Sequence, residues 1–93
     1  MKTDRFLSEL EKIVEDLGYT LRREKGSFRG GFCVLEGDKI VMINKMYPTE
    51  VHVGQIVRFL KHQNLDDRYL KPAVRKELEE WLDRIDKQER ATQ

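Results

Sequence analysis

The chain has little of what several common classes of protein depend on. It contains one cysteine in 93 residues, which excludes an internal disulfide framework and any zinc site built from several cysteines. No apolar run approaches the roughly 18 residues that a membrane-spanning helix needs. The first residues, MKTDRFLSELEK, contain no apolar core followed by a cleavage site, so they do not read as a secretory signal. We therefore expect a soluble protein of a reducing compartment, the cytoplasm.

An excess of charge of either sign is also missing. The chain has 18 basic and 17 acidic residues, which leaves a formal net charge of +1. Binding to nucleic acid or to a membrane would therefore have to come from a local patch of side chains. Hydrophobic residues make up 39% of the chain, which suffices for one modest core. Such a length and composition predict one small domain.

The motifs of metal and nucleotide sites are absent from the sequence. The two histidines, His52 and His62, are ten positions apart, or about 15 Å along a helix, too far to share one metal ion. There is no HExxH, no GxGxxG before a helix and no GxxxxGK. We expect no metal, no cofactor and no catalytic activity.

Apolar residues recur at helical spacing in three segments. The first segment covers about residues 4–17, with Thr3 or Asp4 as its cap and Gly18 as its left-handed end. The second is capped by Thr49 and ends near Asn64, and the third begins at Pro72. The stripes are Phe6, Leu7, Leu10, Ile13, Val14 and Leu17; Val53, Ile56, Val57 and Leu60, with Phe59 beside them; and Val74, Leu78, Trp81, Leu82 and Ile85.

Three strands are predicted between the first two helices. YTLRREK alternates weakly, while GFCVLE and KIVMIN read as two strands of a hairpin joined around residues 36–38. The run IVMI indicates a central strand that is buried on both faces or nearly so. The short links predict an α+β fold, a three-stranded antiparallel β-meander with the helices packed on one face, in the order α-β-β-β-α-α. The domain would cover residues 1–86, and 87–93 would form a polar, disordered tail.

The stretch GSFRGGFC, residues 26–33, lies in the most basic part of the chain. Basic side chains interleaved with an aromatic ring suit single-stranded nucleic acid or another anion, and two adjacent glycines let the backbone approach a ligand. The alternative is a tight turn into the hairpin with solvated arginines. The residues concerned are Arg22, Arg23, Lys25, Phe28, Arg29, Gly30 and Gly31, and Lys45 extends them.

Cys33 permits two interpretations. A nucleophilic cysteine needs an imidazole base and an electropositive setting, and the chain has two histidines and a basic window nearby in sequence. However, Cys33 stands between Phe32 and Val34 in an apolar strand, where a cysteine commonly serves as a small core residue.

Two further segments carry candidate polar residues. Lys71 and Arg75, with Lys76, lie at the start of the third helix, where cations oppose the helix dipole. They would hold an anion, a carboxylate of a partner, or the upstream pair at 66–67. Asn44 ends the hydrophobic strand, a position where asparagine commonly makes turn hydrogen bonds.

The segments FRGGFC, INK and YLKPAVR together resemble a group of small bacterial proteins without an established activity, over about residues 18–81. This resemblance implies no catalytic residues. The order of elements is also similar to that of double-stranded-RNA-binding domains, but PTEVHV lacks the lysine cluster of that family. It is similar as well to the minimal zinc-peptidase core, but the second helix lacks HExxH. Both likenesses concern the fold alone.

These observations favour a non-catalytic cytoplasmic domain that binds another protein or a second copy of itself. The alternative is binding of nucleic acid or an anion through residues 22–31, and a third hypothesis is a thiol enzyme that uses Cys33. The candidate binding residues are Arg22, Arg23, Lys25, Phe28, Arg29, Gly30, Gly31, Lys45, Lys71 and Arg75.

Overall fold

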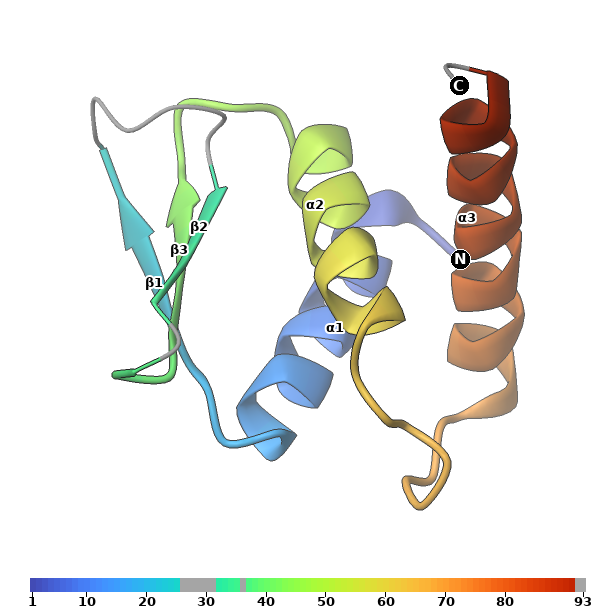
Figure 1. Cartoon of the computed structure of the whole chain (residues 1–93), viewed down its shortest axis with the longest axis horizontal. Coiled ribbons are helices and arrows are strands. Elements are labelled where there is room, and N and C mark those ends of the chain that lie inside the picture. The colour runs from blue at the N-terminus through green and yellow to red at the C-terminus, as the bar shows by residue number, and fades with distance from the viewer. Residues whose placement is uncertain (26–31, 36, 92–93) are drawn as a thin grey trace.

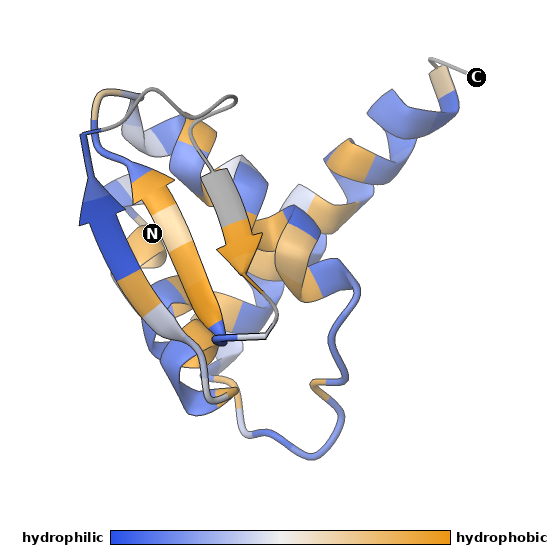
Figure 2. Ribbon diagram, turned by 60° about the vertical axis from the view of Figure 1, so that its left-hand side comes forward, coloured by the Kyte–Doolittle hydropathy of each residue, from blue (hydrophilic) through white to orange (hydrophobic). Residues whose placement is uncertain are grey.

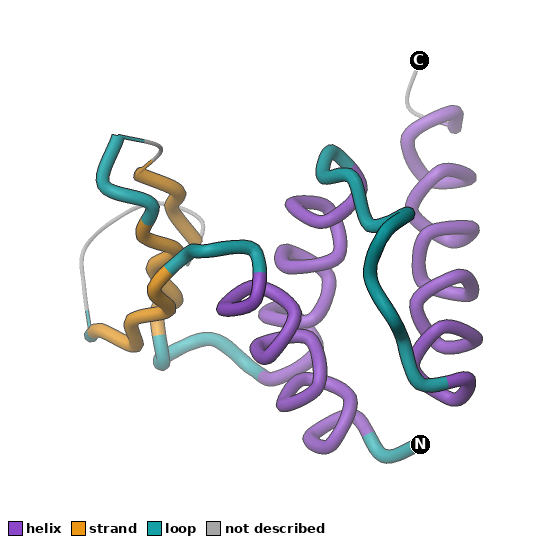
Figure 3. Tube along the Cα trace, turned by 90° about the horizontal axis from the view of Figure 1, so that it is seen from below, coloured by secondary structure: helices purple, strands orange, loops and turns teal. Residues whose placement is uncertain are grey.

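Three helices and three strands follow one another in the predicted order. A computed structural model describes residues 1–25, 32–35 and 37–91. The elements are α1 (Thr3–Asp16), β1 (Thr20–Glu24), β2 (Phe32–Leu35), β3 (Ile40–Asn44), α2 (Thr49–Lys61) and α3 (Pro72–Ala91). They form three layers, with the sheet on one side, α1 and α2 in the middle, and α3 on the side away from the sheet (Figure 1). Figure 3 shows the same layers from below. The α+β class is confirmed.

The helices begin and end for reasons that are partly visible in the sequence. Gly18 follows α1 with a φ of 96°, a conformation that is cheap only for glycine, so the predicted left-handed end is confirmed. The predicted caps are wrong. Lys2 and Pro48 occupy the N-cap positions of α1 and α2 without a side-chain cap hydrogen bond. The second helix stops at Lys61, before the predicted end near Asn64.

The third helix continues further than the hydrophobic stripe predicted. It runs to Ala91, so residues 87–91 are helical rather than part of a disordered tail. Ion pairs support this last part, because Lys87 lies 3.0 Å from Asp83 one turn earlier. Lys61 of α2 also reaches Asp86 at 2.6 Å and Glu89 at 3.0 Å. Polar contacts thus hold a segment that lacks an apolar stripe.

The sheet is mixed, so the predicted antiparallel meander is wrong. Its spatial order is β1-β3-β2, with β1 parallel to β3 and β2 antiparallel to β3. The hairpin between β2 and β3 is as expected. β1 and β2 are far enough apart in the sequence to lie on either side of β3, because two strand spacings amount to only about 10 Å. The central position lets β3, with its apolar run IVMI, pair along both edges while Val41 and Ile43 are removed from water on the helix face.

Only one face of the central strand is fully buried. Val41 and Ile43 point towards the helices and are 0% exposed, together with Leu10 and Val14 of α1. Ile40 and Met42 alternate with them and are only partly buried. The prediction was burial on both faces or nearly so; the structure shows full burial on the helix face and partial burial on the outer face, because α1 and α2 cover one side of the sheet and α3 packs outside them.

Candidate binding surfaces

The two arginines of β1 do not share a surface. Successive residues of a strand point to opposite faces, and Arg22 pairs in register with Met42 on the outer face, while Arg23 pairs with Ile43 on the helix face. The Arg22 guanidinium lies 2.9 Å from the Glu24 carboxylate two residues later. The Arg23 guanidinium forms an ion pair with Glu11 of α1, a contact that raises the pKa of Arg23. Both cations therefore have carboxylate partners within the chain, so the predicted patch is divided.

Two lysines of the predicted patch do lie at the same end of the sheet. The amide of Lys45 donates a hydrogen bond to the carbonyl of Glu24 at 3.1 Å, so Lys25 and Lys45 follow the paired ends of two parallel strands. Both residues are exposed. Phe28, Arg29, Gly30 and Gly31, also predicted for this site, lie outside the described residues, as does the side chain of Cys33.

A buried polar pair supports the loop between β3 and α2. Asn44 is 3% exposed and His52 is 7% exposed. The Asn44 side-chain oxygen accepts the Met46 amide at 3.1 Å, the turn hydrogen bond that the sequence predicted. His52 Nε2 lies 2.8 Å from the Asn44 carbonyl, and since a carbonyl only accepts, this nitrogen donates. The sequence offered His52 only as a metal ligand or base, whereas its observed contact fixes the start of α2 against the end of β3.

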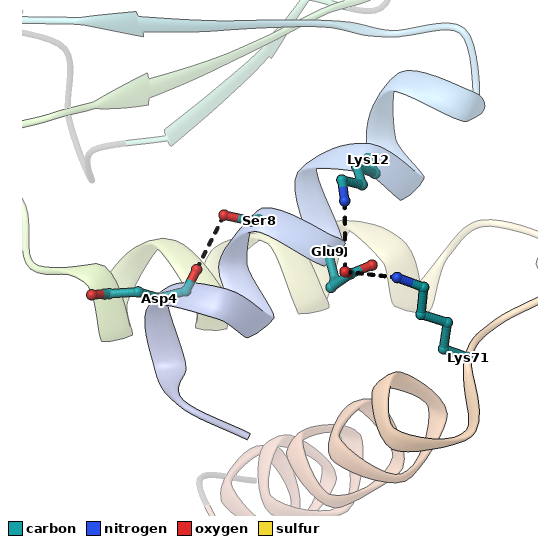
Figure 4. A network of polar contacts seen from close by, with 5 residues as sticks. All are labelled: Asp4, Ser8, Glu9, Lys12 and Lys71. Carbon is teal, nitrogen blue, oxygen red and sulfur yellow. Dashed lines mark hydrogen bonds and ion pairs between the residues drawn. The ribbon is translucent and has the colours of Figure 1, made fainter.

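The candidates at the start of α3 lie far from the sheet. Lys71 Nζ is 3.1 Å from a carboxylate oxygen of Glu9 on α1, and Lys12 approaches the same oxygen at 3.6 Å (Figure 4). The hydrogen bond from Lys71, followed by the charge of Lys12, lowers the pKa of Glu9. Lys71 thus has an internal partner, as one alternative proposed, but the partner is Glu9 rather than the pair at 66–67. Arg75 is exposed one turn further along α3.

A cavity of about 650 Å³ opens beside this ion pair. Its lining mixes both signs of charge, and the two lysines nearest Glu9 already neutralise that carboxylate. The cavity therefore has no clear preference for an anion or a cation. The lining residues are Met1, Lys2, Asp4, Arg5, Glu9, Lys71 and Ala73.

The outer edge of β2 differs from all of these charged regions. The strand has the sequence FCVL, without a charged residue or a proline. Within the described residues it pairs with β3 alone, and its other edge has no partner strand. Leu35 is 39% exposed on the outer face. Figure 2 shows the contrast, with the end of β1 hydrophilic and both β3 and the coloured part of β2 hydrophobic. No pattern of chemistry-bearing residues pointed to this edge, because its signal is a lack of charge.

Sites for a metal or a membrane are not found in the described part of the chain. Residues 1–25, 32–35 and 37–91 contain no group of three or more histidine, cysteine or acidic side chains that could hold a metal ion. Among the helices that these residues form, none has the length and apolar character needed to cross a bilayer.

Comparison with known proteins leaves the family open. No protein-family model matches the chain, no curated protein matches it, and no solved structure matches it. The resemblance to small bacterial proteins therefore stays a prediction, and the function has to be argued from the surfaces described above.

Proposed function

We propose that this chain is a non-catalytic cytoplasmic binding domain that recognises protein by adding an extended segment to the outer edge of β2. The observation that carries the proposal is that this edge is apolar, uncharged and unpaired among the described strands. Strand addition obtains its affinity from main-chain hydrogen bonds and its specificity from the alternating side chains.

The two edges of the sheet support this choice of surface. An edge strand presents unpaired amide and carbonyl groups, and natural proteins protect such edges with charges, prolines or bulges. The other edge, β1, carries Arg22, Arg23 and Glu24, and its arginines are engaged in ion pairs. β2 has none of these protective residues. Because charged residues protect the β1 edge of the same sheet, the lack of such protection on β2 favours a binding function for the β2 edge.

A photo-crosslinking experiment in cells tests the proposal. A photoreactive amino acid replaces Leu35 beside the edge of β2, and a matched variant carries it in place of Thr20, which is exposed on β1. We expect protein adducts at position 35 and few at position 20. Equal adduct formation at both positions, or none at position 35, would contradict the proposal.

Binding of an anion or nucleic acid is the second candidate, favoured by the adjacent positions of Lys25 and Lys45. It predicts binding to single-stranded RNA that weakens steeply with salt and is lost when both lysines are replaced with alanine. The matched control is a double replacement of Lys76 and Lys87 on α3, which preserves the change in net charge. Equal weakening by the control pair would show a nonspecific charge effect.

A further inference from the structure

We infer that the segment added to β2 is the β2 strand of a second copy of this chain, paired antiparallel about a twofold axis. This inference rests on the proposed function and names the partner. The two three-stranded sheets would join into one sheet of six strands, with both β2 strands at its centre.

The charge of the two edges selects this pairing. Like charges that face each other across a strand pair are destabilising, and β2 brings none to a copy of itself. The net charge of +1 adds little long-range repulsion between two molecules. β1 is unsuited to the same role, because pairing would remove water from guanidinium and carboxylate groups that are already engaged with each other and with α1.

Symmetry also favours this pairing over the alternatives. If β2 paired with β1 of the next molecule, β1 of the first molecule and β2 of the second would stay unpaired and could each add a further molecule. Such head-to-tail contacts build open filaments unless they close into a ring. The charges on β1 oppose that contact with an apolar strand. Pairing of β2 with itself uses up the apolar edge of both molecules and leaves only the charged β1 edges at the two ends. The dimer is therefore closed.

The size of the contact predicts a weak dimer. β2 has four residues, which extend over only about 14 Å. Its interface is expected to stay below the roughly 1,000 Å² that a stable complex commonly buries. We therefore expect an equilibrium between monomer and dimer that depends on concentration, rather than a permanent dimer.

Sedimentation equilibrium from about 10 µM to about 1 mM protein tests the inference, since weak interfaces associate in this range. We expect the average mass to rise towards that of the dimer in the unmodified chain. Leu35→Lys should weaken dimerisation at least about tenfold, because it places a charge from each copy in a strand pair that is otherwise apolar. Thr20→Lys makes the same change of charge on β1 and should leave the association constant unchanged. Circular dichroism establishes that both variants are folded.

Amide NMR spectra of the unmodified chain provide a second readout that does not depend on a variant. The signals of Val34 and Leu35 should shift with concentration, while those of Leu21 and Arg22 should not. A monomer at the highest concentration, or shifts centred on β1, would overturn the inference. If the chain is monomeric but position 35 still crosslinks to a different protein, the second copy is excluded and the proposed function stands. If neither association nor crosslinking occurs, both fail.

Discussion

The two edges of the sheet lie on either side of the same apolar strand but differ in how they are protected. β1 carries charged side chains that form ion pairs, Arg22 with Glu24 and Arg23 with Glu11. β2 is uncharged, and β3 is its one partner strand in the part of the chain that the structure describes. A charged edge resists pairing with further strands because its side chains would have to lose water. The difference teaches that two edges of one small sheet can differ in their protection against pairing, and it is the basis of the binding surface proposed above.

The largest expected effect concerns β3, the central strand that pairs with both β1 and β2. Ile43 of β3 is 0% exposed on the helix face, so Ile43→Ala should cost about 2–5 kcal/mol through lost burial and the cavity left behind. Met42→Ala is the matched control on the outer face of the same strand, and it should cost clearly less because Met42 is only partly buried. Urea denaturation measures both losses, and equal losses would mean that the outer face is covered in solution.

The position of β3 shows which part of the fold could be predicted from the sequence. The run IVMI indicated a central strand, and the structure places β3 between the other two. The prediction of a meander failed because it assumed that consecutive strands are neighbours. Strand order depends on contacts between distant residues, and here β1 pairs with β3 rather than with β2, its neighbour in the chain.

The candidate site was harder to predict than the helices. Helix periodicity is local, so the stripes around Phe6 and Val53 identified α1 and α2 correctly. The basic site was predicted from the number of basic residues that lie close together in the sequence. In a strand, however, successive side chains alternate, so Arg22 and Arg23 point to opposite faces. The partner of Lys71 is Glu9, on a helix at the other end of the sequence, and no local pattern identifies such a pair.

The turn that leads into the charged edge should also be sensitive to substitution. Gly18 connects α1 to β1 with a φ of 96°, so Gly18→Ala should lower the free energy of unfolding by about 1 kcal/mol or more, because alanine is strained there. Gly54→Ala is the control. Its new methyl group would meet Arg58 and Trp81 at an ordinary 3.7 Å, and it should stabilise α2 by up to about 1 kcal/mol. Thermal unfolding compares the two, and a loss of stability in Gly54→Ala would contradict this account of helix packing.

The two arginines of β1 should make unequal contributions to stability. Arg23 joins β1 to α1 through Glu11, whereas Arg22 pairs with its neighbour Glu24 on the same strand. Arg23→Ala should therefore cost about 0.5–1 kcal/mol and Arg22→Ala less, because exposed ion pairs contribute little. Denaturation of both variants at low and high salt measures the difference. A larger loss for Arg22→Ala would mean that the charged edge is held mainly within the strand.

The smallest expected effect concerns how the ion pairs of Glu9 with Lys71 and Lys12 respond to acid. Lys71 and Lys12 lower the pKa of Glu9 below its ordinary value of 4.5, so the folded state favours the ionised carboxylate. This stabilisation is fully present above the pKa of the unfolded chain and is lost as the pH falls through the lower pKa of the folded state. Glu9→Gln removes the titrating group, so the acid-induced loss of stability should become less steep than in the unmodified chain. Glu79→Gln, at an exposed position of α3, is the matched control, since it also removes one carboxylate but leaves the contacts of Glu9 with Lys71 and Lys12 in place. Because the uncharged edge of β2 has no group that titrates in this range, the dimerisation inferred above should not follow the same pH dependence. If stability and association were lost at the same acid midpoint, association through β2 would depend on the ionisation of Glu9. That result would contradict the expectation that the two properties are independent.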